Sequence, residues 1–141
     1  MRIAPAVLII DDDLDHARIA SLVLRTLAPD IAVETCHEAG GAMGALDGQP
    51  RGALILVDRL IAGVESFDIV VRMHAARPDA TIVMLSAALS SIDRAYALAC
   101  GARDALEKPA SLAGWRDLLS TLVEVASAPR TPPAPSGTRA A

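Results

Sequence analysis

The sequence predicts an α/β fold in which a five-stranded parallel sheet lies between two layers of helices. Five short runs rich in apolar residues recur along the chain, and segments with helical spacing separate them. Two of the runs consist almost entirely of leucine, isoleucine and valine, as expected of strands that are covered on both faces. This alternation favours right-handed crossovers and a three-layer domain, because a barrel would need about eight such units.

The expected elements follow from these runs in order. The predicted strands are AVLII (6–10), IAVET (31–35), ALILV (53–57), TIVML (81–85) and DALEK (104–108). Between them, apolar residues recur with the spacing of a buried helical face. The clearest examples are Ile19 with Val23, Val70 with Met73, and Leu112 with Trp115 and Leu119. We expect Trp115 to lie in the core rather than on a binding surface.

The length and the distribution of prolines predict one domain with a tail. A chain of 141 residues is near the size of a single compact domain, which we place at residues 1–127. Residues 128–141 are rich in proline and alanine and offer almost nothing to bury, so a disordered C-terminal tail is expected there.

Composition and charge exclude several classes of protein. The net charge of −4 argues against direct binding of nucleic acid, which normally needs a basic face. The apolar stretch at the N-terminus is short and is interrupted by Pro5, so we expect neither a signal peptide nor a membrane span, and a cytoplasmic protein. Cys36 and Cys100 lack metal-binding spacing and are expected to stay reduced.

Carboxylates follow two of the predicted strands. Asp11, Asp12 and Asp13 come directly after the first strand, and Asp58 follows the third. The carboxyl ends of parallel strands meet at one edge of a sheet, so these side chains are expected to converge. Like charges about 4 Å apart repel by roughly 4 kcal/mol at an effective dielectric constant of about 20. A hard cation with oxygen ligands, above all Mg²⁺, would remove that cost.

Two further polar groups are predicted at the same edge. Ser86 ends the fourth strand, and Lys108, followed by Pro109, ends the fifth. A nucleophile, metal ligands, a hydroxyl donor and a cation would then lie together. Such a set suits phosphoryl transfer, in which the protein positions the group and neutralises its charge. Asp58 would be the nucleophile and would form an aspartyl phosphate.

The strands and the polar residues at their ends together resemble those of a known family. The segments VLIIDDD, LILVDRLIAG, IVMLSA and GARDALEKP match, in order and spacing, the receiver domains of two-component response regulators over about residues 5–126. The resemblance implies a flavodoxin-like (βα)5 fold with strand order 2-1-3-4-5. With no output domain recognised after residue 126, a stand-alone receiver is expected.

The resemblance also implies roles at the metal site. Asp11 and Asp12 match the acidic pair that holds Mg²⁺, Asp58 matches the phosphoacceptor, and Leu60 would contribute its backbone carbonyl to the metal. Asp13 is expected to cap the first helix instead of binding metal.

The phosphoryl group would be held by the other strand ends. Ser86 matches the hydroxyl that turns toward the phosphoryl oxygen, and Ala87 matches the residue whose backbone N–H binds it. Lys108 matches the lysine that pairs with the phosphate, and its bond to Pro109 is expected to be cis.

The implied function is that of a signalling switch. A histidine kinase or histidine phosphotransfer protein would donate the phosphoryl group, and the phosphorylated state would change binding to a downstream effector protein. We expect no catalytic turnover beyond autocatalytic phosphoryl acceptance and slow self-dephosphorylation, and a monomer or a weak phosphorylation-linked dimer.

The sequence departs from the family's pattern at several positions. Ala105 stands where receivers usually carry the aromatic residue that reports on the hydroxyl, so output through another element, such as the loop 60–66, is an option. The family's Pro-Gly and Asp-Gly pairs in that loop are Ala62-Gly63 and Glu65-Ser66 here. Leu60 and Ala88 cannot orient water, which predicts slow hydrolysis of the aspartyl phosphate.

Two other functions remain open. Asp11 and Asp13 satisfy the minimal DxD of haloacid-dehalogenase-like phosphatases, but the Leu14 and Asp15 that follow do not fit, and Asp58 would have no role. A degenerate receiver that signals by contact alone is slightly favoured by Ala105. The intact set of polar strand-end residues argues against it.

Overall fold

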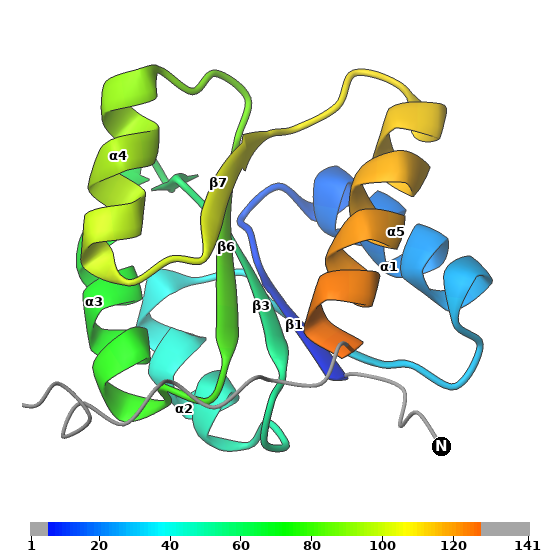
Figure 1. Cartoon of the computed structure of the whole chain (residues 1–141), viewed down its shortest axis with the longest axis horizontal. Coiled ribbons are helices and arrows are strands. Elements are labelled where there is room, and N and C mark those ends of the chain that lie inside the picture. Colours follow the sequence, from blue (N-terminus) through cyan, green and yellow to red (C-terminus); the bar gives the residue numbers. More distant parts are fainter. Residues whose placement is uncertain (1–5, 128–141) are drawn as a thin grey trace, which may run out of the picture.

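The computed structural model describes residues 6–127 (Figure 1). The predicted tail, residues 128–141, lies outside the described residues, as do residues 1–5. The strands of the main sheet are β1 (Ala6–Ile10), β2 (Ala32–Cys36), β3 (Leu54–Asp58), β6 (Thr81–Ser86) and β7 (Asp104–Glu107). The helices are α1 (Leu14–Leu27), η1 (Ala39–Gly41, a 3₁₀ turn), α2 (Ala42–Asp47), α3 (Phe67–Ala76), α4 (Ser91–Cys100) and α5 (Leu112–Ser127).

The main sheet is parallel throughout, with the order β2-β1-β3-β6-β7. Counted along the chain, its five strands stand in the order 2-1-3-4-5, so the predicted topology is confirmed. Helices α1 and α5 cover one face, and α2, α3 and α4 cover the other (Figure 1). The crossovers place successive helices on these faces in the manner of a doubly wound α/β domain.

The central strands are buried on both faces. Along β1, Leu8 and Ile10 belong to the core under α2, α3 and α4, whereas Val7 and Ile9 belong to the core under α1 and α5. This two-sided burial explains why the central strands read as continuous apolar runs instead of alternating ones. Trp115 is 4% exposed and packs in the second core, as predicted.

Some element ends differ from the predicted ranges. Strand β2 lies one residue later than predicted, and β7 ends at Glu107, so Lys108 follows the strand rather than closing it. Strand β3 includes Asp58 as its last residue. These shifts of one residue are common at strand ends, where pairing stops gradually.

A small hairpin occupies the loop that follows β3. Strands β4 (Leu60–Ile61) and β5 (Val64–Glu65) pair antiparallel, with Leu60 opposite Glu65. The two residues of the turn, Ala62 and Gly63, have φ of 52° and 78°. Positive φ at both central residues is the requirement of the two-residue hairpin turn whose twist matches the flanking strands. From the sequence, residues 60–66 were expected to form a loop, and the hairpin is an addition to that expectation.

None of the helices within residues 6–127 has both the length and the apolar character needed to cross a membrane.

Candidate functional site

The site lies along the carboxyl ends of β1, β3, β6 and β7, at the upper edge of the sheet in Figure 1. Asp58 ends β3 opposite Leu85, one residue before Ser86 ends β6. Asp11 follows β1 directly, and Lys108 follows β7 and donates its backbone N–H to the Ser86 carbonyl at 2.8 Å. The parallel register therefore brings these four residues, distant in sequence, to one level.

Three carboxylates converge at this edge. Asp11, Asp12 and Asp58 each offer one oxygen within 4.8 Å of the others. Local hydrogen bonds orient two of them: Asp11 Oδ1 accepts the backbone N–H of Asp13 at 2.9 Å, and Asp12 Oδ2 accepts that of Ala62 at 2.9 Å. A group of closely spaced carboxylate oxygens is the donor set that hard divalent cations such as Mg²⁺ prefer. The residues thus fit the metal that the sequence implied.

Asp13 serves the neighbouring helix instead. Its side chain caps α1 by accepting the backbone N–H groups of Asp15 and His16 at 3.0 and 3.1 Å. These bonds lower the pKa of Asp13, because they stabilise the charged carboxylate. The predicted role as a helix cap is confirmed.

Lys108 supplies a buried positive charge. Its side chain is 6% exposed, and Nζ lies 2.8 Å from Asp11 Oδ2 and 3.3 Å from Asp58 Oδ2. Nζ also lies 3.0 Å from His16 Nδ1, which therefore accepts a hydrogen from the ammonium group. Three acceptors hold the lysine over the acidic cluster, where it neutralises only part of the negative charge.

The surplus of negative charge is visible in Asp58. The pKa of Asp58 is raised to about 6; burial is the main cause, the neighbouring Asp11 carboxylate adds to the rise, and Lys108 opposes both effects. A carboxyl group with this pKa holds a proton more tightly than an ordinary aspartate does. An additional cation at the cluster would favour the charged form, in agreement with a metal site.

The Ser86 hydroxyl is buried and fully engaged. Ser86 is 3% exposed; its Oγ donates to the carbonyl of Ala88 at 2.7 Å and accepts from Arg59 Nε at 3.0 Å. The hydroxyl proton is therefore directed to Ala88 and not toward Asp58. Arg59 was missed by the sequence analysis, although a cation directly after the proposed nucleophile was a signal that could have singled it out.

The structure also locates the residues expected to contribute backbone groups. Ala87 lies in the bend after β6 and is exposed, and Leu60 lies in β4 with its side chain 38% exposed. The parts assigned to the Ala87 N–H and the Leu60 carbonyl stay predictions.

Two sequence-based expectations concern the strand that carries Lys108. The Lys108–Pro109 peptide is trans, so the expected cis bond is wrong. An X-Pro bond favours trans intrinsically, and with this isomer the Lys108 ammonium already reaches both carboxylates. Ala105, at the position of the usual aromatic residue, is 1% exposed and packs in the core beside Met84.

A histidine outside the predicted set also contacts the site. His37 Nδ1 lies 3.0 Å from the backbone carbonyl of Asp11, so this nitrogen carries the proton and donates. The contact ties the end of β2 to the end of β1. Nothing in the spacing of His37 along the chain indicated it.

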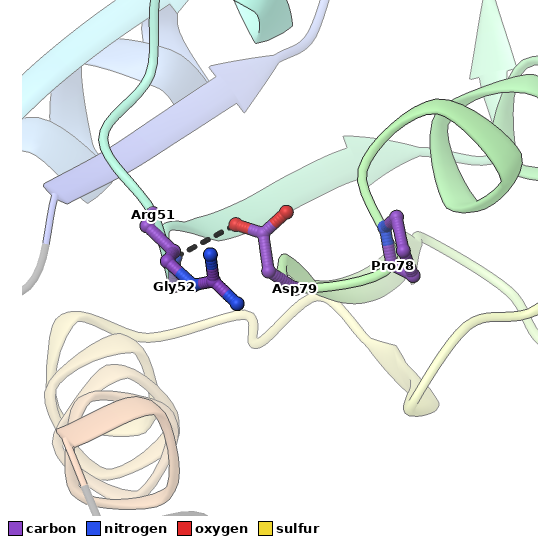
Figure 2. Close-up of a pocket in the computed structure, with 4 residues that line it drawn as sticks. All are labelled: Arg51, Gly52, Pro78 and Asp79. Carbon is purple, nitrogen blue, oxygen red and sulfur yellow. Dashed lines mark hydrogen bonds between the residues drawn. The ribbon is translucent and has the colours of Figure 1, made fainter.

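A polar hollow lies at the other end of the sheet from the acidic cluster, beside the segments that precede β3 and β6 (Figure 2). It is lined by Arg51, Gly52, Pro78 and Asp79. Asp79 Oδ2 accepts the Gly52 N–H at 2.9 Å, and both carboxylate oxygens lie 3.0 Å from the guanidinium of Arg77. These partners lower the pKa of Asp79, with Arg77 as the main cause. The Asp79 carboxylate is thus bonded by groups of the protein itself.

Known proteins resemble this chain over most of its length. The model of the "Response regulator receiver domain" family matches residues 7–120. The transcriptional regulatory protein TcrA of Mycobacterium tuberculosis is 29% identical over 124 residues, which cover 87% of this chain and 49% of TcrA. The chain therefore spans about half the length of this relative.

Solved structures show the same fold. A CheY-like receiver domain protein from Methanospirillum hungatei superposes with a TM-score of 0.75 at 23% identity, covering 88% of this chain and 94% of that one. A response regulator from Burkholderia pseudomallei, solved with a phosphorylated aspartic acid, a calcium ion and citrate, gives 0.72 at 24% identity, covering 87% and 69%. With the family match over residues 7–120, these likenesses lead to one conclusion: the chain belongs to the response regulator receiver domain family.

Proposed function

We propose that Asp58 is the phosphoacceptor of this receiver domain and that its phosphorylation requires Mg²⁺. The observation that carries the proposal is the convergence of Asp11, Asp12 and Asp58 at one rim, with Lys108 Nζ 3.3 Å from Asp58 Oδ2. A carboxylate, a metal-ligand set and a buried cation are the parts that phosphoryl transfer to aspartate needs.

In the proposed reaction, a carboxylate oxygen of Asp58 attacks the phosphorus of a phosphohistidine on a histidine kinase or phosphotransfer protein. The P–O bond to Asp58 forms, the P–N bond breaks, and the released imidazole nitrogen takes a proton from solvent. Lys108, the Ser86 hydroxyl and the Ala87 N–H then bind the phosphoryl oxygens.

Mg²⁺ would be held by the carboxylates of Asp11, Asp12 and Asp58 and by the Leu60 carbonyl. Bound there, the metal would neutralise charge on the phosphoryl oxygens. The raised pKa of Asp58 supports the need for this cation, because the protein's own Lys108 leaves the cluster with surplus negative charge.

Phosphorylation would alter contact with a downstream effector protein. The added charge at Asp58 draws in Ser86 and Lys108 and so shifts an equilibrium between two arrangements of the rim. The partners are expected in the cytoplasm, where receivers of this family meet their kinases. The net charge of −4 supports a protein partner for this domain rather than nucleic acid.

The test is phosphate-affinity gel mobility after incubation with acetyl phosphate, with and without Mg²⁺, beside Asp58→Asn. A shifted band that needs Mg²⁺ and is lost in the variant is the expected result. Absence of a shifted band in the wild type would contradict the proposal and favour a degenerate receiver that acts by contact alone, to which the buried Ala105 lends some support.

The same gel, followed over time, tests the expected slow hydrolysis. Leu60 and Ala88 present no side chain that orients water, so the shifted band should persist well beyond seconds without a phosphatase. Leu60→Asn should shorten its lifetime roughly tenfold or more, whereas Leu112→Asn, on exposed α5 surface, should not. A wild-type lifetime of seconds would refute the slow-hydrolysis prediction.

A further inference from the structure

Arg59 connects the Ser86 hydroxyl to the β4–β5 hairpin. Its Nε donates to Ser86 Oγ at 3.0 Å, while its Nη1 donates to Glu65 Oε1 at 2.6 Å. Glu65 belongs to β5, directly opposite Leu60 of β4. One guanidinium thus bridges the buried end of β6 and an exposed hairpin.

The backbone of Arg59 is fixed, so only its side chain is free to respond. Its N–H donates to the Leu85 carbonyl at 2.8 Å, and its carbonyl accepts the Ser66 N–H at 2.8 Å. The Ser66 hydroxyl, fully buried, donates to the carbonyl of Asp58 at 2.6 Å. These bonds hold the base of the hairpin against β6 and α3 and leave its β4–β5 tip anchored through side chains.

The Ser86 hydroxyl has a single proton, which now points to Ala88. To donate to a phosphoryl group on Asp58, Ser86 must turn and give up that bond. Its oxygen then moves relative to Arg59 Nε, and the guanidinium, only 16% exposed, must follow the oxygen or find another acceptor. The new phosphoryl charge would compete with Glu65 for the guanidinium.

The contact of Arg59 with Glu65 extends this movement beyond the site. Glu65 is 49% exposed, and its pairing with Arg59 fixes the strand β5 that faces Leu60. A change at the guanidinium therefore alters the restraint on the hairpin. In many receivers an aromatic side chain in β7 responds to the position of the hydroxyl. This chain lacks that side chain, because Ala105 occupies the position within the core.

We propose that Arg59 is a positioning residue that holds Ser86 in its withdrawn orientation and passes the turn of Ser86 to the Leu60–Glu65 hairpin through Glu65. The inference rests on the proposed phosphorylation of Asp58. It assigns the conformational readout of this receiver to the hairpin.

The test is two-dimensional ¹H–¹⁵N NMR of the full chain with Mg²⁺, before and after addition of beryllofluoride, which binds an aspartate carboxylate as a phosphoryl mimic. In the wild type, amide shifts should change at Asp58 and Lys108 and also at residues 60–65. In Arg59→Ala the changes at the site, including those at Leu60 beside the proposed metal, should remain, and those at Val64 and Glu65 should be lost.

Further variants separate positioning from folding. Arg59→Lys should not restore the hairpin response, because one ammonium cannot reproduce the planar bridge between Ser86 and Glu65. Ser86→Ala should lose the hairpin response too, and the double variant Arg59→Ala/Ser86→Ala should show no further loss, since both residues act in one chain of contacts. Arg94→Ala removes a comparable surface pair with Asp104, at 2.9 Å, and should keep the response.

The outcomes are distinct. No beryllofluoride-dependent change at Asp58 or Lys108 in the wild type would overturn the proposed function and this inference with it. Changes at the site without changes at Val64 and Glu65, or an unchanged response of these two residues in Arg59→Ala, would overturn the inference alone.

Discussion

At the scale of single residues, the proposed nucleophile carries an energetic cost. Asp58 is charged at neutral pH in a partly buried position beside Asp11, and Lys108 compensates only in part. The raised pKa is the measure of that cost. A group held in an unfavourable state at its working pH is a common feature of functional sites, where chemistry rather than stability sets the residue type.

Asp58→Asn should therefore stabilise the metal-free protein at neutral pH. The folded pKa of about 6 exceeds the ordinary value of 3.8, so the folded state binds the proton more tightly than the unfolded state does. The free energy of unfolding then falls as pH rises from about 4 to about 6. The full shift corresponds to about 3 kcal/mol; solvent screening and the lost attraction to Lys108 reduce the expected gain at pH 8 to roughly 1–2 kcal/mol.

Urea unfolding of both proteins at pH 8 and pH 4 measures this difference. The advantage of Asp58→Asn should shrink at pH 4, where the wild-type carboxyl is protonated in the folded state. Saturating Mg²⁺ at pH 8 should favour the wild type, because binding to the folded state adds stability. A variant that is less stable than the wild type at pH 8 without Mg²⁺ would contradict this description of the site.

At the scale of elements, the packing of α4 against α3 depends on the glycine that ends α4. Gly101 ends α4 in the left-handed conformation, with φ of 114°. The same residue lets α4 lie close to α3, since a Cβ there would come within 2.5 Å of the His74 ring. Both the dihedral angle and the contact require glycine at this position.

Gly101→Ala should thus lower the free energy of unfolding by about 1–2 kcal/mol or more, through left-handed strain and the clash with His74. Gly44→Ala is the matched control: it lies within α2, and its added Cβ meets nothing within 4 Å. That variant should be stabilised by about 0.5–1 kcal/mol, because alanine favours helix over glycine. Urea unfolding measures both, and equal effects of the two variants would refute the argument.

At the scale of the whole molecule, the two ends of the sheet have separate tasks. The carboxyl ends carry the acidic cluster, Ser86 and Lys108. At the amino ends, the Arg77 guanidinium pairs with Asp79 and donates to the carbonyls of Leu46, Gln49 and Pro50, which closes the end of α2. These bonds hold together the segments that precede β3 and β6, at the end of the sheet opposite the acidic cluster.

The sequence predicted the rim because its polar residues stand directly at strand ends. Once the strands are parallel, Asp11, Asp58, Ser86 and Lys108 must share an edge, whatever the details of packing. The hydrogen bond from Arg59 to Ser86 joins residues 27 positions apart in the sequence and depends on one side-chain rotamer. The spacing of residues along the chain therefore does not predict this contact.

The sequence pattern does not predict the β4–β5 hairpin either. Its strands have two residues each, too few for a periodic signal, and Ala62 at a left-handed position is not the residue that marks such a turn. Its amide is instead held by the Asp12 carboxylate, a contact that exists only after β1 and β3 have paired.

The central claim is that Asp58, and no other aspartate of the rim, takes the phosphoryl group. Reaction with acetyl phosphate and Mg²⁺, reduction of the acyl phosphate with borohydride, and peptide mass spectrometry locate the modified residue directly. The account predicts homoserine at position 58 alone. Homoserine at Asp11 would support phosphatase-like chemistry, and an unmodified chain would support a contact-only module; either result would contradict the account.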